Sequence, residues 1–151
     1  MNLICTWQEK LAFTAKMPDG LSVTMDALPP LGKGAGPAPK QLALAAICGC
    51  TGMDVVSLLR KHKQNVTQFE IGADAPVFET HPHSFKSVSL VYRVRGEVDP
   101  AVLRDSISAS MTKFCAVSAM ISQAAPISYT IELNGAAVGT GEAAFNLQGR
   151  K

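Results

Sequence analysis

The stretch GPAPKQLALAAICGCTGMDVVSLLRK, residues 36–61, decides the fold of this chain. From Lys40 to about His62 there is no proline, and apolar side chains cover every side of a helical wheel of about 3.6 residues per turn. This pattern predicts one long buried helix over residues 40–62. Because one small sheet cannot cover such a helix, its free side needs another layer, and we expect a matching helix of a second subunit to supply it.

A transmembrane span is the alternative interpretation of this helix, because residues 41–59 carry a single charge. That charge is Asp54, which lies well inside the window together with glycine, threonine and serine residues. Strands are expected on both sides of the helix and no second span is predicted, which disfavours insertion. The N-terminal residues MNLICTWQEKLAF also lack the basic stretch and the cleavage site of a secretory signal. We therefore expect a cytoplasmic protein that does not enter a membrane.

The segments before the helix predict strands and one loop. Residues 2–28 alternate and are rich in β-formers, and Pro18-Asp19-Gly20 stands between two such runs, which predicts a hairpin. Residues 29–39 hold four prolines and three glycines in eleven positions, which forbids regular structure. We expect the longest loop of the chain there.

The segments after the helix begin with a second predicted hairpin. Residues 66–74 and 85–95 alternate with period two, although the register of the second strand stays open near its start. Asp99 followed by Pro100 then predicts a capped helix that continues to about Thr112.

The last third of the chain predicts a short helix and a final hairpin. The helix covers about residues 115–123, and the hairpin joins residues 127–133 to 136–145 through Asn134-Gly135. The tail beyond Leu147 is expected to be loose. Strands and helices in this order predict an α+β fold, and a length of 151 residues predicts a single domain over residues 1–151.

The composition limits the function classes. The apolar fraction is 47% and the charged fraction 17%, which indicates surface hidden in an oligomer. The net charge is +2 and the basic residues are scattered, so we expect no nucleic-acid partner. No phosphate-binding or dinucleotide-binding glycine motif is present, and we expect no cofactor.

The candidate reactive residues are the four cysteines, at positions 5, 48, 50 and 115. Cys48 and Cys50 differ by about 200° around a helix axis, so their thiols point to nearly opposite faces and cannot hold one metal together. Thr51, Asp54 and Ser57 follow as a polar stripe on an otherwise apolar helix. The Asp54 carboxylate leans toward the Cys50 sulfur, and its negative charge disfavours a thiolate there.

A thiolate at Cys50 would therefore need a cation from elsewhere. Candidates are Lys33 in the loop, Arg93 or Arg95 on a strand, or a basic residue of a partner subunit. Cys115 lies near a predicted helix start and close to Lys113, which favours its ionisation, although a buried structural cysteine is the alternative.

The two histidines of the segment HPH, His81 and His83, flank a proline and could suggest a metal site. A closed zinc site needs three or four ligands, and the sequence holds no spaced Cys/His set to complete one. We therefore expect no metal site from the sequence.

Two separate segments resemble the OsmC/Ohr family of organic hydroperoxide reductases. The stretch around Cys50 resembles the first family signature, MTKFCAVSAMI resembles the second cysteine segment, and the spacing of 65 residues from Cys50 to Cys115 fits. The resemblance implies two antiparallel sheets around long central helices in an intertwined homodimer, with active sites at the subunit interface. The segment DVVSLL after the cysteine is similar to a less characterised branch.

The resemblance also implies a function. Cys50 would attack an organic hydroperoxide and Cys115 would resolve the sulfenic acid as a disulfide, which a thiol or a lipoylated protein would reduce. The family places a glutamate where this chain has Gln41, and it uses an arginine before the first cysteine that this chain lacks. Lys33 or Lys40 could only approximate that arginine.

Two further functions remain open. The first is a non-catalytic carrier that keeps the dimer and an apolar cavity for small molecules. The second is a general thiol oxidoreductase that acts on protein disulfides.

Overall fold

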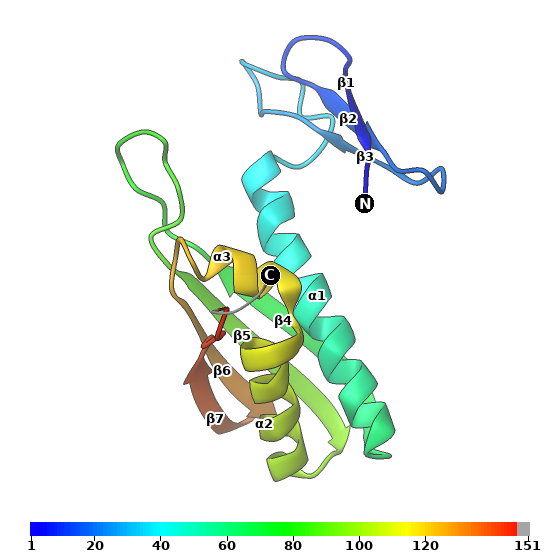
Figure 1. The fold of residues 1–151 in the computed structure, drawn as a ribbon, viewed down its shortest axis with the longest axis vertical. Coiled ribbons are helices and arrows are strands. Elements are labelled where there is room, and N and C mark those ends of the chain that lie inside the picture. Colours follow the sequence, from blue (N-terminus) through cyan, green and yellow to red (C-terminus); the bar gives the residue numbers. More distant parts are fainter. Residues whose placement is uncertain (148–151) are drawn as a thin grey trace. The chain divides into compact units, whose positions relative to one another are not determined.

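The apolar segment forms the predicted helix, α1, which runs from Pro39 to Lys61 in the computed structural model (Figure 1). The structure describes residues 1–147, so the expected loose tail beyond Leu147 lies outside the described residues. By its length and its mean hydropathy of 1.9, α1 could cross a membrane, and it is the one such helix in the described part of the chain. The chain divides into two compact units, Met1–Ala45 and a second that begins at Ala46. The single domain over residues 1–151 therefore stays a prediction.

The N-terminal unit contains a three-stranded antiparallel sheet. Its strands are β1 (Ile4–Trp7), β2 (Phe13–Lys16) and β3 (Ser22–Met25), in that order. The loop predicted after the sheet is present, and the buried Asp26 organises it, because its carboxylate accepts backbone N–H groups of Ala35, Lys33 and Ala27 at 3.1, 2.9 and 2.7 Å. These hydrogen bonds, Ala35 and Lys33 foremost, lower the pKa of Asp26.

The second unit contains a four-stranded sheet. Its strands, in spatial order, are β4 (Asn65–Asp74), β5 (Val88–Glu97), β6 (Ile127–Leu133) and β7 (Ala136–Glu142). The expected hairpins β4–β5 and β6–β7 are antiparallel, but β5 and β6 are parallel, so this sheet is mixed where the resemblance implied an antiparallel one. The physical reason is the long helical connection between β5 and β6, which returns the chain to the end where β5 began.

That connection consists of three helical segments, α2 (Pro100–Ala109), a π-helical segment η1 (Ser110–Phe114) and α3 (Ala116–Ile121). The predicted cap is confirmed, because Asp99 Oδ1 accepts the N–H groups of Ala101 and Val102 at 2.7 and 3.2 Å. The α-helical geometry ends at Ala109, earlier than predicted, and continues as the wider π-turn. Figure 1 shows α1, α2 and α3 over one face of the four-stranded sheet.

Strand β5 shows which face of this sheet is the core. Val88, Leu90, Tyr92 and Val94 are at most 1% exposed, so one parity of the strand faces the helices. Phe85 lies before the strand, in an isolated bridge with Val77, so the predicted strand over residues 85–95 begins only at Val88. The other parity, which includes Arg93 and Arg95, is exposed on the opposite face.

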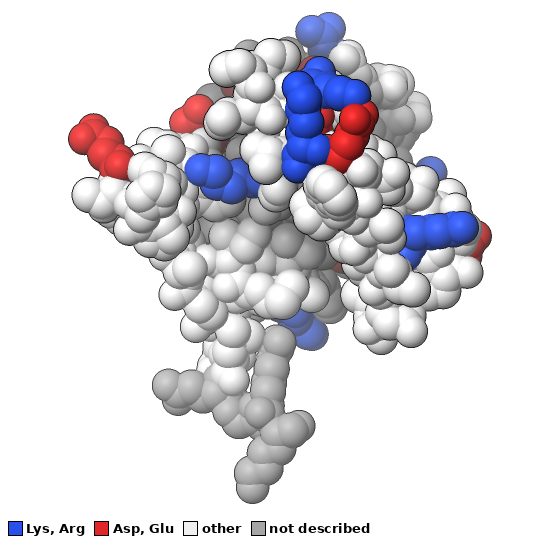
Figure 2. Space-filling model, turned by 90° about the horizontal axis from the view of Figure 1, so that it is seen from above, with Lys and Arg blue, Asp and Glu red and all other residues white. Residues whose placement is uncertain are grey.

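The described surface carries few charges. In Figure 2 uncharged side chains predominate on the visible face, and they separate the Lys and Arg residues into isolated positions and small groups. This agrees with the charged fraction of 17%.

Candidate active site

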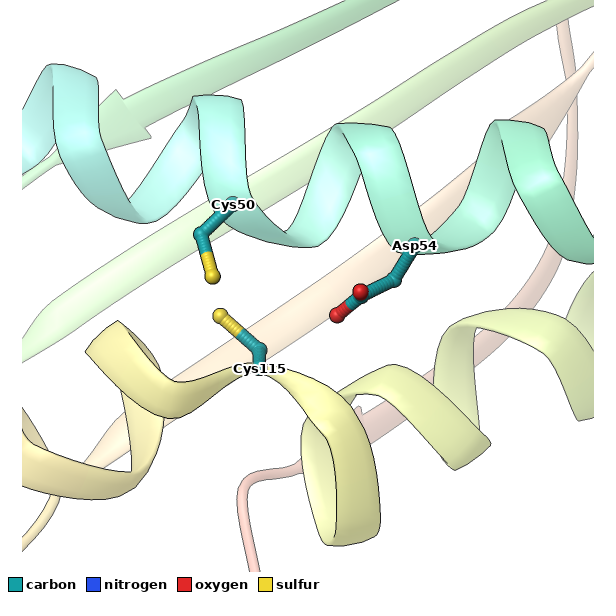
Figure 3. A group of neighbouring side chains, drawn as sticks. All are labelled: Cys50, Asp54 and Cys115. Atoms are coloured by element: carbon teal, nitrogen blue, oxygen red, sulfur yellow. The ribbon is translucent and has the colours of Figure 1, made fainter.

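Two thiols and one carboxylate meet between α1 and the start of α3 (Figure 3). The Sγ atoms of Cys50 and Cys115 and a carboxylate oxygen of Asp54 all lie within 4.8 Å of one another. Cys115 is completely buried, while Cys50 and Asp54 are half-buried and therefore the more accessible members. Both cysteines are free thiols. The arrangement brings together two cysteines that are 65 positions apart in the sequence.

The π-turn η1 determines where Cys115 stands. Its last turn closes with the Cys115 N–H donating to the Ser110 carbonyl at 2.9 Å, after which Cys115 adopts extended backbone with φ −66° and ψ 100°. The helical path is thereby broken and Cys115 becomes the N-cap of α3. Its sulfur accepts the Ser118 N–H at 3.4 Å, and its S–H donates to Ser118 Oγ at 3.0 Å. A π-turn beside a reactive side chain is a frequent feature of functional sites.

The ionisation of Cys115 is controlled by its burial. Burial raises the pKa of the Cys115 thiol to about 11, and the neighbouring Cys50 adds to the increase, whereas the two hydrogen bonds with Ser118 oppose it. Lys113 does not offset this burial, since it is exposed and its Nζ lies 5.2 Å from the centre of the Phe114 ring. Of the two alternatives that the sequence left open for Cys115, the structure agrees with the buried thiol, because desolvation outweighs the helix start.

A chain of hydroxyl groups leads from the sheet to Asp54. Ser110 Oγ donates to Asp54 Oδ2 at 2.9 Å and lies 2.9 Å from Thr51 Oγ1, which lies 2.8 Å from the Tyr92 hydroxyl. Since Ser110 has one hydroxyl proton, Thr51 must donate to Ser110, and Tyr92 must then donate to Thr51. All donors thus point toward the carboxylate. Burial also raises the pKa of Tyr92, so this residue remains a donor.

Replacing Thr51 with valine is expected to destabilise the fold by about 1–3 kcal/mol, because it leaves the Tyr92 hydroxyl without its acceptor inside the core. Thr51 and Ser110 are both completely buried, so water cannot readily replace the lost partner. Urea unfolding measures the change. Thr140→Val, the same change at an exposed position of β7, is the control and is expected within about 0.5 kcal/mol of the parent. Equal stability of the two variants would contradict the role of the hydroxyl chain.

Only some residues of this hydroxyl network were predicted from the sequence. Thr51 was noticed as part of the polar stripe, but Ser57 of that stripe is exposed and does not join Asp54. Ser110 and Tyr92 were missed. A signal existed for Ser110, because Ser106 and Ser110 are four residues apart and so share the buried face of a helix.

Gln41 and Lys33, the two other predicted site residues, have local partners in the N-terminal unit. Gln41 is the third residue of α1, and its Oε1 accepts the Ala38 N–H at 2.8 Å, which is half of a capping box. Lys33 forms an exposed salt bridge with Glu9. The local structure thus gives Gln41 a helix-capping role and gives Lys33 an acidic partner.

The predicted cation on β5 is also engaged elsewhere. Arg93 donates from Nη1 to Glu70 at 3.0 Å, and its Nε lies 3.3 Å from Glu132. It lies on the face of the sheet opposite to Tyr92, and Arg95 shares its parity. Within its own unit, the structure therefore turns both arginines away from Cys50 and puts an acid, Asp54, beside the thiols.

Cys48 lies on a different side of α1 from Cys50, as the helical spacing predicted. It lines an open groove of about 660 Å³ between α1 and β4, together with Gly49, Met53, Arg60 and Phe69. Burial raises the pKa of the Cys48 thiol. Met53 is 72% exposed in this groove, so α1 presents a large uncovered apolar side.

Comparison with known proteins gives one family. The family model described as OsmC-like protein matches residues 32–130, a range that includes both site cysteines. Protein YhfA of Escherichia coli strain K12 is 29% identical over 128 residues, which cover 84% of this chain and 93% of YhfA.

Solved structures share the fold. A hypothetical protein from Aquifex aeolicus VF5 is 25% identical with a TM-score of 0.79, and the match covers 88% of this chain and 95% of that one. A putative organic hydroperoxide resistance protein from Vibrio cholerae, solved with captopril in one of its active sites, is 15% identical with a TM-score of 0.61, over 91% and 94% of the chains. The second likeness shows the fold alone.

Proposed function

Because the chain belongs to the OsmC-like protein family, we propose that it is a thiol peroxidase that reduces organic hydroperoxides through Cys50 and Cys115. The observation that carries the proposal is the approach of the two thiols and Asp54 to within 4.8 Å. Proteins of the OsmC/Ohr group are typically dimeric and act on hydroperoxides, and structures of hydroperoxide resistance proteins have the same fold. This supports a peroxidase-related stress protein.

Cys50 is the proposed nucleophile because it is the more accessible of the two thiols. Its proton passes to the Asp54 carboxylate, and the resulting thiolate attacks the terminal oxygen of the hydroperoxide. The O–O bond breaks, an S–O bond forms, and the alkoxide takes the proton back from Asp54 and leaves as an alcohol. Asp54 thus serves as a local base beside the attacking thiol.

Cys115 is the proposed resolving thiol. Its sulfur attacks the Cys50 sulfenic acid, the S–O bond breaks, and a disulfide and one water molecule are formed. A dithiol reductant, for which a lipoylated protein is the candidate, then returns both thiols by exchange. Burial of Cys115 keeps it protonated and unreactive toward the hydroperoxide until the sulfenic acid is within reach.

The direct test is to count free thiols in reduced protein before and after addition of cumene hydroperoxide. Two of the four thiols are expected to disappear with one equivalent of peroxide, and peptide mapping should find one disulfide between Cys50 and Cys115. Cys5→Ser is the matched control and should behave like the parent. Survival of all four thiols in excess peroxide would refute the proposal.

The uncovered side of α1 supports a homodimer. Members of this family are soluble, and we propose that this protein is cytoplasmic. We also propose that the apolar groove beside Met53 receives helix α1 of a second copy. The wild-type protein is then expected at twice its chain mass of 16.0 kDa in analytical ultracentrifugation. Met53→Glu buries a charge in that contact and should give the monomer, whereas the exposed Met120→Glu on α3 should not. A dimeric Met53 variant would place the contact elsewhere.

A carrier protein is the second candidate function, and the groove of about 660 Å³ favours it if a small apolar molecule, and not a second copy, fills the groove. Native mass spectrometry of freshly purified protein would reveal a retained apolar ligand. A clean dimer mass together with rapid loss of two thiols to peroxide would exclude this alternative.

A further inference from the structure

We propose that, in the reduced protein, Cys50, Asp54 and Cys115 form a binding site for Zn²⁺ with one open coordination position. Among residues 1–147 this is the one group of three Cys, His, Asp or Glu side chains close enough to share an ion. Two sulfurs and one carboxylate oxygen are donors that Zn²⁺ accepts, and thiolates select it over Mg²⁺ or Ca²⁺. His81 and His83 of the HPH segment do not belong to the group. The site was not predicted from the sequence, because its ligands come from two segments that are far apart in the chain.

The distances fit the ion after small movements. Around a tetrahedral Zn²⁺, with Zn–S of about 2.3 Å and Zn–O of about 2.0–2.2 Å, neighbouring donors stand about 3.5–3.8 Å apart. The three donor atoms here lie within 4.8 Å of one another, so each separation needs to close by about 1.3 Å at most. Figure 3 shows the two thiols and the carboxylate directed into the same space, so changes of side-chain torsion suffice.

The neighbouring hydrogen bonds hold two of the ligands in place. Ser110 donates to Oδ2 of Asp54, which orients the carboxylate and leaves Oδ1 for the ion. Ser118 donates its N–H to the Cys115 sulfur, an interaction that a metal-bound thiolate keeps. Such partners are the supports that metal ligands require, and their loss commonly lowers metal affinity by about 10–100-fold.

Binding of the ion and oxidation of the thiols exclude each other. Zn²⁺ replaces the two S–H protons by two Zn–S bonds and releases both protons, without any change of oxidation state. A disulfide between Cys50 and Cys115 removes two of the three ligands. Oxidised protein therefore cannot bind the ion, and, if the proposed peroxidase function holds, bound Zn²⁺ inhibits it by occupying the nucleophile.

Cobalt titration of the reduced, full-length protein tests the site, because Co²⁺ substitutes for Zn²⁺ and reports its ligands by absorption. We expect one Co²⁺ per chain, a sulfur-to-cobalt charge-transfer band, the visible bands of a four-coordinate ion, and displacement by one equivalent of Zn²⁺. Cys50→Ser and Cys115→Ser should lose the charge-transfer intensity, and Ser110→Ala should weaken binding by about 10-fold. Cys5→Ser, the same change at the exposed thiol of the N-terminal unit, is the matched control and should bind normally.

Three results would overturn the inference: no Co²⁺ binding by reduced wild-type protein, a six-coordinate spectrum without sulfur bands, or binding that survives Cys50→Ser. Peroxidase activity measured in the presence of a chelator separates this inference from the proposed function. Activity without metal binding would refute the site alone, and metal binding without activity would refute the peroxidase alone.

Discussion

Replacement of Cys50 by serine is expected to lower the rate of organic hydroperoxide consumption by at least about 10³-fold, because the nucleophile is lost while its size is nearly unchanged. Cys50 is half-buried on α1 and its sulfur faces Cys115, so substrate can reach it without unfolding of the helix. The measurement is peroxide consumption with dithiothreitol as reductant. Cys5→Ser, the same change at an exposed thiol of the N-terminal unit, should leave the rate unchanged.

Cys115→Ser separates attack from resolution. It is expected to react once with the hydroperoxide and then to accumulate the Cys50 sulfenic acid, because no thiol remains nearby to form the disulfide. Dimedone labelling of Cys50 in this variant, and its absence in Cys50→Ser, would establish the order of the two thiols. Labelling of Cys115 in the Cys50 variant would instead assign the attack to Cys115.

Asp54→Asn is expected to slow the oxidation of Cys50 by about 10²-fold, which is the contribution of a positioned base at the lower end of its usual range. Asparagine retains an oxygen that accepts the Ser110 hydroxyl, so the buried hydroxyl chain and the fold should persist. Stopped-flow measurement of sulfenic acid formation gives the rate. The variant removes the negative charge and the base together.

The sign of the Asp54→Asn effect distinguishes two roles. If Asp54 only repels a thiolate, as its charge alone suggests, the variant should react faster than the parent. A slower variant indicates the proton-transfer role that we propose. Asp105→Asn, an exposed acid on α2, controls for the loss of one negative charge and should react like the parent.

Much of the secondary structure could be predicted because its causes are local. The apolar wheel of α1, the cap of α2 by Asp99 and the Asn134-Gly135 turn each depend on residues close in sequence, and each is confirmed. The parallel pairing of β5 with β6 was not predicted. The two strands pair because the helical connection between them packs over the sheet, and no local sequence pattern specifies that packing.

The site residues divide in the same way. The proximity of Cys50 and Asp54 was predictable, because the two residues are one helical turn apart. Gln41, which stands where the family has a glutamate, has a local role as a cap of α1. The sequence left the ionisation of Cys115 open between a thiol favoured by a helix start and a buried cysteine. A lysine two residues away is visible in the sequence, but the complete burial that controls the thiol is not.

The sequence by itself determined the α+β class and the long apolar helix, because periodicity, caps and turns act over a few residues. Its two cysteine segments carried the resemblance to the family. Only the tertiary structure decided that both thiols and Asp54 share one space, that serine, threonine and tyrosine hydroxyls point toward the carboxylate, and that the arginines of β5 face away. These outcomes depend on which faces of distant elements meet. Burial of the whole core determines which faces of the helices and strands pack together, and no single segment determines this alone.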